Sequence, residues 1–221
     1  MRYKTLRALA SPFMKILWPT TFYGTENIIL DSRAIYTCNH YSVMDTNALV
    51  AKVFVNELNV VIKEEAFKSK FGAMFLTNIG GIPIKRGDAD VEAVKKILKV
   101  LKDDRQLMLF PEGTRNKAHT KELLEIKSGA VVFALKTNSP IVPMIQYRSP
   151  KLFRRNYILI GKPIYFDKYK GQKINAIKEE ANQELIDAMN SLRIQLDDII
   201  ENYHGNIKKF NAAHNLLLEK K

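Results

Sequence analysis

The chain has 221 residues, enough for one domain with a sizeable core, and its composition is that of an ordinary globular protein rather than a disordered one. The formal net charge of +12 points to a polyanionic partner, such as nucleic acid, an anionic membrane face or phosphorylated substrates, without choosing among them. A single cysteine excludes a disulfide framework within the chain and fits a reducing interior, and four histidines without a cysteine cluster argue against a structural zinc site.

Residues 2 to 17 have an amphipathic pattern, in which apolar side chains recur at helical spacing and basic ones occupy the other face. The apolar members are Leu6, Leu9, Phe13, Ile16 and Leu17. Pro12 predicts a break into two short helices, with Ser11 capping the second. Such a stretch either packs on the protein's own core or lies in a membrane interface, and the pattern alone favours neither. No apolar run reaches the ~18 residues of a membrane-spanning helix, and the stretch is a poor signal peptide, so we expect a cytoplasmic protein.

Farther along, short apolar runs of strand length alternate with helical patterns. The strand-like runs are AIYTC (34–38), VVIK (60–63), LMLF (107–110), IVPMI (141–145) and YILIG (157–161). The helical patterns are DTNALVAKVF (45–54), DVEAVKKILKVLKD (90–103), KSGAVVFALKTN (127–138) and a longer one from 172 to 203, with a last helical piece toward the C-terminus. This alternation predicts an α/β fold, in which ligands bind beyond the carboxyl ends of the strands.

The first polar cluster to follow a strand-like run contains Asn39, His40, Ser42 and Asp45. Ser42 and Asp45 have the spacing of a capping box, which is the structural explanation of Asp45 and, taken alone, the better one. If a helix begins near Ser42, the side chains of His40 and Asp45 can also meet across its start. The aspartate would then fix the tautomer of the imidazole and make His40 a general base, whereas the alternative is a histidine satisfied by local hydrogen bonds.

Three further clusters are weaker when each is taken alone. Pro111 to Arg115 reads as a tight turn, in which Gly113 permits close approach of the backbone to a ligand. GGIPIKRGD (80–88) contains Lys85 and Arg86, which either grip a phosphate or form a solvated basic turn. Pro143 within IVPMI indicates an edge strand, a bulge or a strand end.

Together and in this order, these clusters resemble the four sequence blocks of the glycerolipid acyltransferases, in particular the bacterial 1-acyl-glycerol-3-phosphate acyltransferases. NHYSVMD (39–45) resembles their N-H-x-S-x-x-D signature, GGIPIKR (80–86) their G-x-x-F-I-x-R block, FPEGTR (110–115) the third block and IVPM (141–144) the fourth. The chain departs from the pattern at Pro83, where Phe is usual, at Lys85, where Asp is frequent, and at Asn116, where Ser often stands. These departures concern the fit of the acceptor's head group rather than the reaction class.

The resemblance implies a single α/β domain with a central mixed, largely parallel sheet flanked by helices. It also implies transfer of an acyl group from acyl-CoA or acyl carrier protein to the sn-2 hydroxyl of lysophosphatidic acid, which gives phosphatidic acid without a bound cofactor or metal. His40 would be the general base and Asp45 its partner, with backbone N–H groups near Gly113 as candidate donors to the oxyanion. The residues implied to bind the acceptor are Arg86, Glu112, Gly113, Thr114 and Arg115.

A bilayer acceptor favours the membrane interpretation of the N-terminus. We therefore expect a membrane-associating segment at 1–24 and an acyltransferase domain at 25–221, including the helical region 172–221. The protein would be peripheral, on the cytoplasmic face of the cell membrane, with the anionic membrane surface as partner and no nucleic acid.

Four alternatives remain at this stage. The acceptor could be glycerol-3-phosphate or another lysophospholipid. The protein could be a basic nucleic-acid-binding module, although its positive charge is scattered along the chain, or a non-catalytic lipid-binding relative. Cys38 could act with His40 as a nucleophile and form a covalent acyl intermediate, although thiols inside apolar strands are usually inert.

Overall fold

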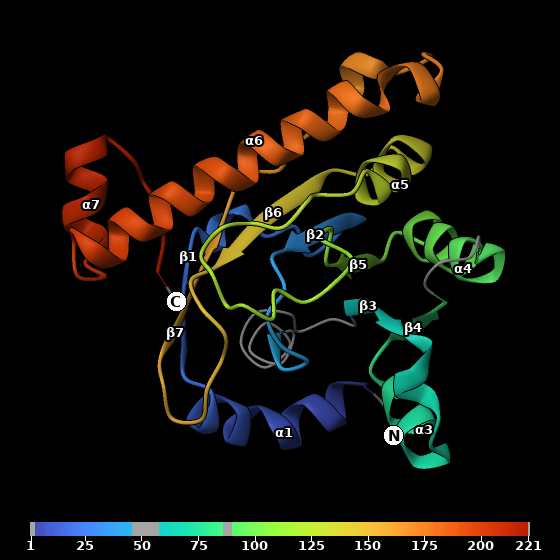
Figure 1. Cartoon of the computed structure of the whole chain (residues 1–221), viewed down its shortest axis with the longest axis horizontal. Coiled ribbons are helices and arrows are strands. Elements are labelled where there is room, and N and C mark those ends of the chain that lie inside the picture. Colours follow the sequence, from blue (N-terminus) through green and yellow to red (C-terminus); the bar gives the residue numbers. More distant parts are fainter. Residues whose placement is uncertain (1–2, 46–57, 86–89, 221) are drawn as a thin grey trace.

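The computed structural model describes residues 3–45, 58–85 and 90–220 (Figure 1). Residues 46–57 lie outside this description, and with them most of the helix predicted for 45–54. The same holds for Arg86, so its predicted role in acceptor binding has no structural counterpart in the described residues.

A seven-stranded sheet runs through the described part of the chain, in the order β1-β7-β6-β2-β5-β3-β4. Its strands are β1 (Thr20–Tyr23), β2 (Ala34–Cys38), β3 (Leu58–Lys63), β4 (Gly81–Ile84), β5 (Gln106–Leu109), β6 (Ile141–Gln146) and β7 (Asn156–Ile160). Every neighbouring pair is parallel except β6 and β7, which are antiparallel. The predicted mixed, largely parallel sheet is therefore confirmed.

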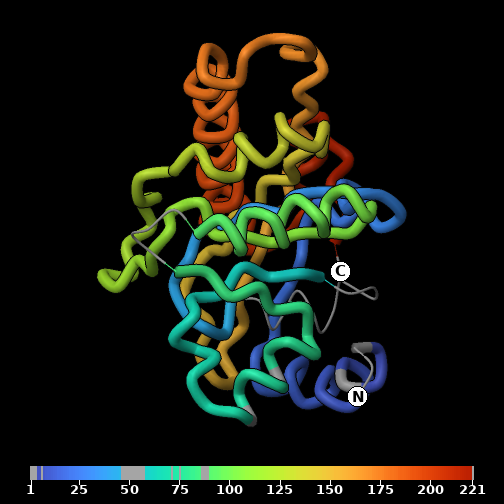
Figure 2. The backbone as a smooth tube through the Cα atoms, turned by 90° about the vertical axis from the view of Figure 1, so that its right-hand side faces the viewer, coloured from blue at the N-terminus to red at the C-terminus, as the bar shows by residue number. Residues whose placement is uncertain are grey.

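Helices flank this sheet. They are α1 (Tyr3–Leu17), α3 (Lys70–Asn78), α4 (Val91–Lys102), α5 (Gly129–Thr137), α6 (Ile174–Glu201) and α7 (Ile207–His214). The helices α4, α5 and α6 bury their apolar stripes against one face of the sheet, while α1 lies at the opposite end of the molecule from α6 (Figures 1 and 2). A second core cluster, which includes Tyr36, Cys38 and Met108, fills the other face. Because the strands are buried on both faces, they read as continuous apolar runs in the sequence.

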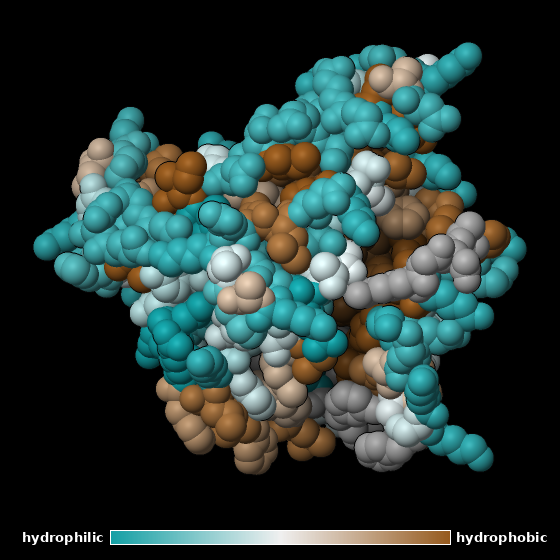
Figure 3. Space-filling view, viewed as in Figure 1, coloured by the Kyte–Doolittle hydropathy of each residue, from teal (hydrophilic) through white to brown (hydrophobic). Residues whose placement is uncertain are grey.

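The helix α1 is continuous, with Pro12 inside it, so the predicted break into two helices with Ser11 as a cap is wrong. A proline removes one backbone hydrogen bond and bends a helix, but the turns on either side keep their own bonds. The large apolar side chains that α1 exposes are Leu9, Phe13 and Ile16, at 62 %, 67 % and 66 %. Figure 3 shows hydrophobic side chains gathered over α1 along the lower edge of the molecule. In the described ranges, no helix combines the length and the apolar character needed to cross a bilayer.

The strand β1 falls within the stretch 1–24 that the sequence sets apart from the catalytic domain. It pairs with β7 at the edge of the sheet, and all four of its residues are buried. From Thr20 onward the chain is therefore part of the sheet, and the predicted boundary at residue 24 is not a structural break. Four residues that begin with two threonines carry too little apolar pattern to indicate a strand.

Pro143 lies in β6, which is an interior strand between β7 and β2, so the edge position considered from the sequence is wrong. The Pro143 carbonyl accepts a hydrogen bond of 2.8 Å from the Gly161 N–H, just beyond the last residues of the β6–β7 ladder. The nitrogen of Pro143 faces the same side as its carbonyl, so the missing donor costs the sheet one bond at the end of a ladder. Pro143 therefore lies where the pairing of β6 with β7 ends, although β6 still pairs with β2 at this residue.

Several segments that are distant in the sequence meet at one edge of the sheet. The strands β2, β5 and β6 run parallel and end at this edge, which we call the carboxyl edge. Because β7 runs antiparallel to β6, and β1 parallel to β7, both of these strands begin at the carboxyl edge. The end of α1, the loop 147–155 and the residues that follow β2 and β5 therefore lie at the edge where open α/β sheets bind their ligands.

Candidate active site at the carboxyl edge

Asn39 fixes the point where the chain leaves β2. Its side-chain amide donates to the Gln146 carbonyl at 3.1 Å, and its side-chain oxygen accepts from the Gln146 N–H at 2.8 Å. Both residues are buried, so this two-bond bridge joins the ends of β2 and β6 where the regular ladder stops. Arg193 of α6 donates to the same Gln146 carbonyl at 3.1 Å. The sequence placed Asn39 in the first polar cluster but gave no sign of these partners.

His40 and Asp45 are in contact, as the sequence predicts. The His40 Nδ1 and the Asp45 Oδ2 are 2.8 Å apart, and the imidazole stacks on the ring of Phe110 at 3.9 Å between centroids. The His40 side chain keeps 11 % exposure while that of Asp45 keeps 1 %, so the histidine lies on the outer side of the pair. Since an ionised aspartate can only accept, Nδ1 carries the proton and Nε2 is left as the basic nitrogen.

Asp45 also closes the start of the following turn. Its Oδ2 accepts from the backbone N–H groups of Tyr41 at 2.7 Å and Ser42 at 2.8 Å, while the Ser42 hydroxyl accepts from the Met44 N–H at 3.2 Å. The contacts expected of a capping box and the contact with the imidazole of His40 are therefore present together. The backbone bonds fix the carboxylate, and the fixed carboxylate orients the imidazole.

Glu112 lies behind His40. It is 2 % exposed, and its Oε2 accepts from the His40 backbone N–H at 3.4 Å. Burial raises the pKa of Glu112 to about 7, and the charge of Asp45 adds to this rise, while the N–H groups of His40 and Leu124 oppose it. The sequence grouped Glu112 with the acceptor-binding residues, and in the structure it contacts the backbone of His40.

The turn that follows β5 is closed by Gly113. This glycine has a φ of +65°, which side chains disfavour, and its N–H donates to the Phe110 carbonyl at 3.0 Å. That N–H is therefore engaged within the turn, and the neighbouring backbone N–H groups stay the predicted candidates for an oxyanion. The next two residues, Thr114 and Arg115, are exposed.

Two residues of this region escaped the sequence analysis as contributors to the site. Lys127 lies across Gly113, since a Cβ built there would be 3.4 Å from the Lys127 Nζ, and the Lys127 N–H donates to the Pro111 carbonyl at 2.9 Å. Asn116 is buried and donates its N–H to the His40 carbonyl at 2.7 Å. Asn116 entered the sequence analysis only as a departure from the family pattern, and Lys127 carried no signal there.

Cys38 is a poor candidate for a nucleophile. It is 1 % exposed and belongs to the second core cluster. Burial raises the pKa of its thiol well above the usual range, and the charges of Asp45 and Glu112 raise it further. A thiol held protonated inside the core cannot attack a thioester.

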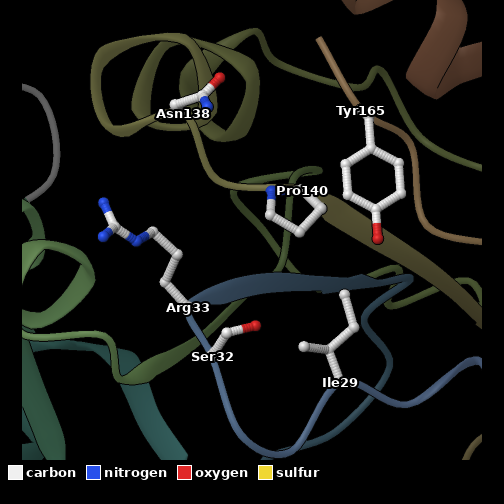
Figure 4. Close-up of a pocket in the computed structure, with 6 residues that line it drawn as sticks. All are labelled: Ile29, Ser32, Arg33, Asn138, Pro140 and Tyr165. Carbon is white, nitrogen blue, oxygen red and sulfur yellow. The ribbon is translucent and has the colours of Figure 1, made fainter. Parts of the chain in front are cut away.

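A surface cavity lies away from the carboxyl edge. A cavity of about 400 Å³ is lined by Ile29, Ser32, Arg33, Asn138, Pro140 and Tyr165 (Figure 4). It opens near the amino ends of β2 and β6, on the edge opposite His40. The charge of Arg33 is already engaged by Asp104 at 2.7 Å. Across the described ranges, no cluster of three histidine, cysteine or carboxylate side chains could hold a metal ion.

Comparison with known proteins places this geometry in a family. The family model described as Acyltransferase matches residues 19–146, more than half of the chain, and this range includes the His40–Asp45 pair. The chain belongs to the acyltransferase family. The family resemblance of the four sequence blocks is thereby confirmed.

Two relatives of this acyltransferase carry the name 1-acyl-sn-glycerol-3-phosphate acyltransferase. The protein from Cocos nucifera is 32 % identical over 168 residues, which cover 71 % of this chain and 53 % of the relative. The protein from Bacillus subtilis (strain 168) is 28 % identical over 180 residues, which cover 77 % of this chain and 88 % of the relative. The acyltransferase thus spans about half the length of the first relative and most of the second.

A solved structure shares the fold of this acyltransferase. The crystal structure of the 1-acyl-sn-glycerophosphate (LPA) acyltransferase PlsC from Thermotoga maritima matches with a TM-score of 0.63 and 21 % identity. The match covers 86 % of this chain and 78 % of that one, so it includes most of the sheet and its helices.

Proposed function

We propose that this protein transfers a fatty acyl group from an acyl thioester, acyl-CoA or acyl carrier protein, to the sn-2 hydroxyl of 1-acyl-sn-glycerol-3-phosphate, giving phosphatidic acid. The observation that carries the proposal is the 2.8 Å contact between His40 and Asp45 at the carboxyl edge of a family member. The names of the relatives from Cocos nucifera and Bacillus subtilis support the choice of acceptor.

The chemistry follows from the free nitrogen of His40. A hydroxyl is a poor nucleophile, so Nε2 takes its proton as the oxygen attacks the thioester carbon, and Asp45 stabilises the imidazolium. Collapse of the tetrahedral intermediate breaks the carbon–sulfur bond, and the imidazolium returns the proton to the departing thiolate. No acyl-enzyme is needed, which agrees with the buried, protonated thiol of Cys38.

The acceptor's phosphate requires cations near His40. Arg115 and Lys127 are exposed around the turn that begins at Phe110, and the ring of Phe110 stacks on His40. An arginine can grip a phosphate with two parallel hydrogen bonds, and a lysine adds a point charge. In our proposal Thr114 lies beside them, and Arg86 joins them from the second sequence block.

The membrane supplies the acceptor. The exposed apolar side chains of α1 and the net charge of +12 support peripheral docking on an anionic membrane face through the α1 part of the segment 1–24. The cytoplasmic leaflet carries such a negative surface, and each nearby lysine or arginine adds about 1 kcal/mol of attraction. We therefore place the protein on the cytoplasmic face of the cell membrane.

The direct test incubates the purified protein with lysophosphatidic acid and a panel of acyl-CoA and acyl carrier protein donors while thiol release is followed. We expect turnover that falls about 10²- to 10⁴-fold in His40→Ala, which lacks the general base. Glycerol-3-phosphate and other lysophospholipids, tested in parallel, identify the acceptor. Turnover with one of these but none with lysophosphatidic acid would replace the acceptor, and no turnover of any thioester would overturn the proposal.

A further inference from the structure

The loop 147–155, which joins β6 to β7, exposes large apolar side chains at its tip. Leu152 is 56 % exposed and Phe153 is 71 % exposed. Phe153 also has a φ of +58°, a left-handed conformation that bulky residues rarely adopt. Neither the disfavoured backbone conformation nor the exposure of the aromatic ring to water stabilises the fold. A residue of this kind is therefore a candidate for a functional contact.

This loop is attached to α1. The Phe153 N–H donates to the carbonyl of Leu17, the last residue of α1, at 2.7 Å, and the Asn156 N–H donates to the Pro19 carbonyl at 2.8 Å. A tight turn, in which the Arg154 N–H donates to the Lys151 carbonyl at 3.2 Å, fixes the position of the tip. The tip and the helix, far apart in the sequence, are therefore neighbours at the carboxyl edge (Figure 1).

The charge of the loop is of one sign. Its sequence, YRSPKLFRR, contains four basic residues and no acidic one. Lys151 and Arg154 flank the apolar tip and are exposed, and within the described ranges no carboxylate forms an ion pair with either of them. The apolar tip is suited to the acyl-chain boundary of an anionic bilayer, and the basic residues on either side of it are suited to the lipid phosphates.

We propose that the loop 147–155 is a second membrane-insertion element beside α1. Leu152 and Phe153 enter the acyl-chain boundary, while Lys151 and Arg154 contact the lipid phosphates. Two attachment points fix the tilt of the protein better than one helix does, and they turn the carboxyl edge toward the bilayer. A lysolipid can then reach His40 without leaving the membrane surface; this step rests on the proposed function.

The first experiment measures flotation with vesicles of phosphatidylcholine and phosphatidylglycerol. The full-length double variant Leu152→Ser/Phe153→Ser should lose about tenfold or more in partition coefficient, because two large apolar side chains no longer enter the lipid. The matched control is Ile194→Ser, which removes a side chain of 71 % exposure from α6, the helix that lies opposite α1 in Figure 1. Equal binding of the double variant and the wild type would overturn the inference.

The second experiment locates the loop in the bilayer. The chain has one tryptophan, Trp18, so Trp18→Phe provides a silent background for a single probe. In this background, Phe153→Trp should be quenched by lipids with brominated chains, and Ile194→Trp should not. Quenching at position 153 no stronger than at position 194 would contradict insertion.

These readouts separate the two proposals. Flotation and quenching do not depend on catalysis, so a loop that fails both tests in a protein that still turns over thioesters refutes only the membrane element. A loop that inserts in a protein without thioester turnover refutes only the proposed reaction.

Discussion

One carboxylate oxygen of Asp45 contacts both the backbone of the turn and the imidazole of His40. Its Oδ2 receives the backbone N–H groups of Tyr41 and Ser42 and also the Nδ1 of His40. Removing the whole side chain would therefore disturb the turn as well as the imidazole. A change that keeps the shape of the side chain is needed to tell orientation from folding.

We expect Asp45→Asn to lower kcat by about 10²- to 10⁴-fold with a smaller effect on KM, because a neutral amide neither fixes the productive tautomer nor stabilises the imidazolium. Thiol release measures kcat, and circular dichroism measures thermal stability. Ser42→Ala is the matched control: it removes only the bond to the Met44 N–H, so it should cost about 1 kcal/mol of stability and leave kcat nearly unchanged. Equal losses of kcat in the two variants would assign Asp45 a structural role alone.

The raised pKa of Glu112 predicts that the stability of the protein depends on pH. Its pKa is raised from 4.5 to about 7 in the folded protein, mainly by burial. Between these values the unfolded chain binds fewer protons than the folded one, so the free energy of unfolding falls as the pH rises through this window. At full effect the loss amounts to roughly 3 kcal/mol.

Glu112→Gln should flatten this dependence, because the amide resembles the protonated acid and does not titrate. Urea unfolding of the variant and the wild type between pH 4.5 and 8 makes the comparison, and the difference between the two curves isolates residue 112 from other titrating groups. The explanation fails if the two curves stay parallel over the window.

At the scale of elements, α6 packs closely on the sheet at Gly161. A Cβ at this position would lie 2.6 Å from the Leu192 Cδ1 and 3.1 Å from the Pro143 Cγ. Because Gly161 has no side chain, Leu192 of α6 and the ring of Pro143 can both pack against its backbone.

Gly161→Ala should lower the free energy of unfolding by about 1–3 kcal/mol, because the added methyl group overpacks a core that is already filled. Gly129→Ala is the control: this glycine opens α5, and a Cβ there meets nothing within 4 Å. The control should gain about 0.5–1 kcal/mol from helix propensity and from a less flexible unfolded chain. Chemical denaturation measures both variants, and a neutral Gly161→Ala would show that α6 can shift away.

Long elements with a regular apolar period can be predicted from the sequence, whereas short ones cannot. The helices α4 and α6 follow strong patterns with a period near 3.6, and the structure has them within a few residues of the predicted ranges. The helix α3 and the strands β1 and β4 were not predicted as elements. Both strands have only four residues, too short for a period to show.

At the scale of the whole molecule, the net charge of +12 and the apolar surface at the carboxyl edge predict a salt effect. Binding to phosphatidylglycerol vesicles should weaken as salt rises from 0.1 M to 1 M, since the screening length falls from about 10 Å to about 3 Å. Binding to pure phosphatidylcholine should be weaker and nearly independent of salt. Flotation at several ionic strengths tests this prediction. The variant His40→Ala serves as a control, because it should bind vesicles as the wild type does. Salt-independent binding to both kinds of vesicle would rule out electrostatic docking.

The sequence by itself determined the family, the α/β alternation and the meeting of His40 with Asp45. These features depend on local order along the chain, and a pair five residues apart at the start of one turn needs no long-range information. Only the tertiary structure decided that Glu112 is buried against the backbone of His40, 72 residues away, and that Phe153 adjoins the end of α1. Contacts of this kind follow from the order and direction of the strands, which the spacing of apolar residues along the chain does not encode.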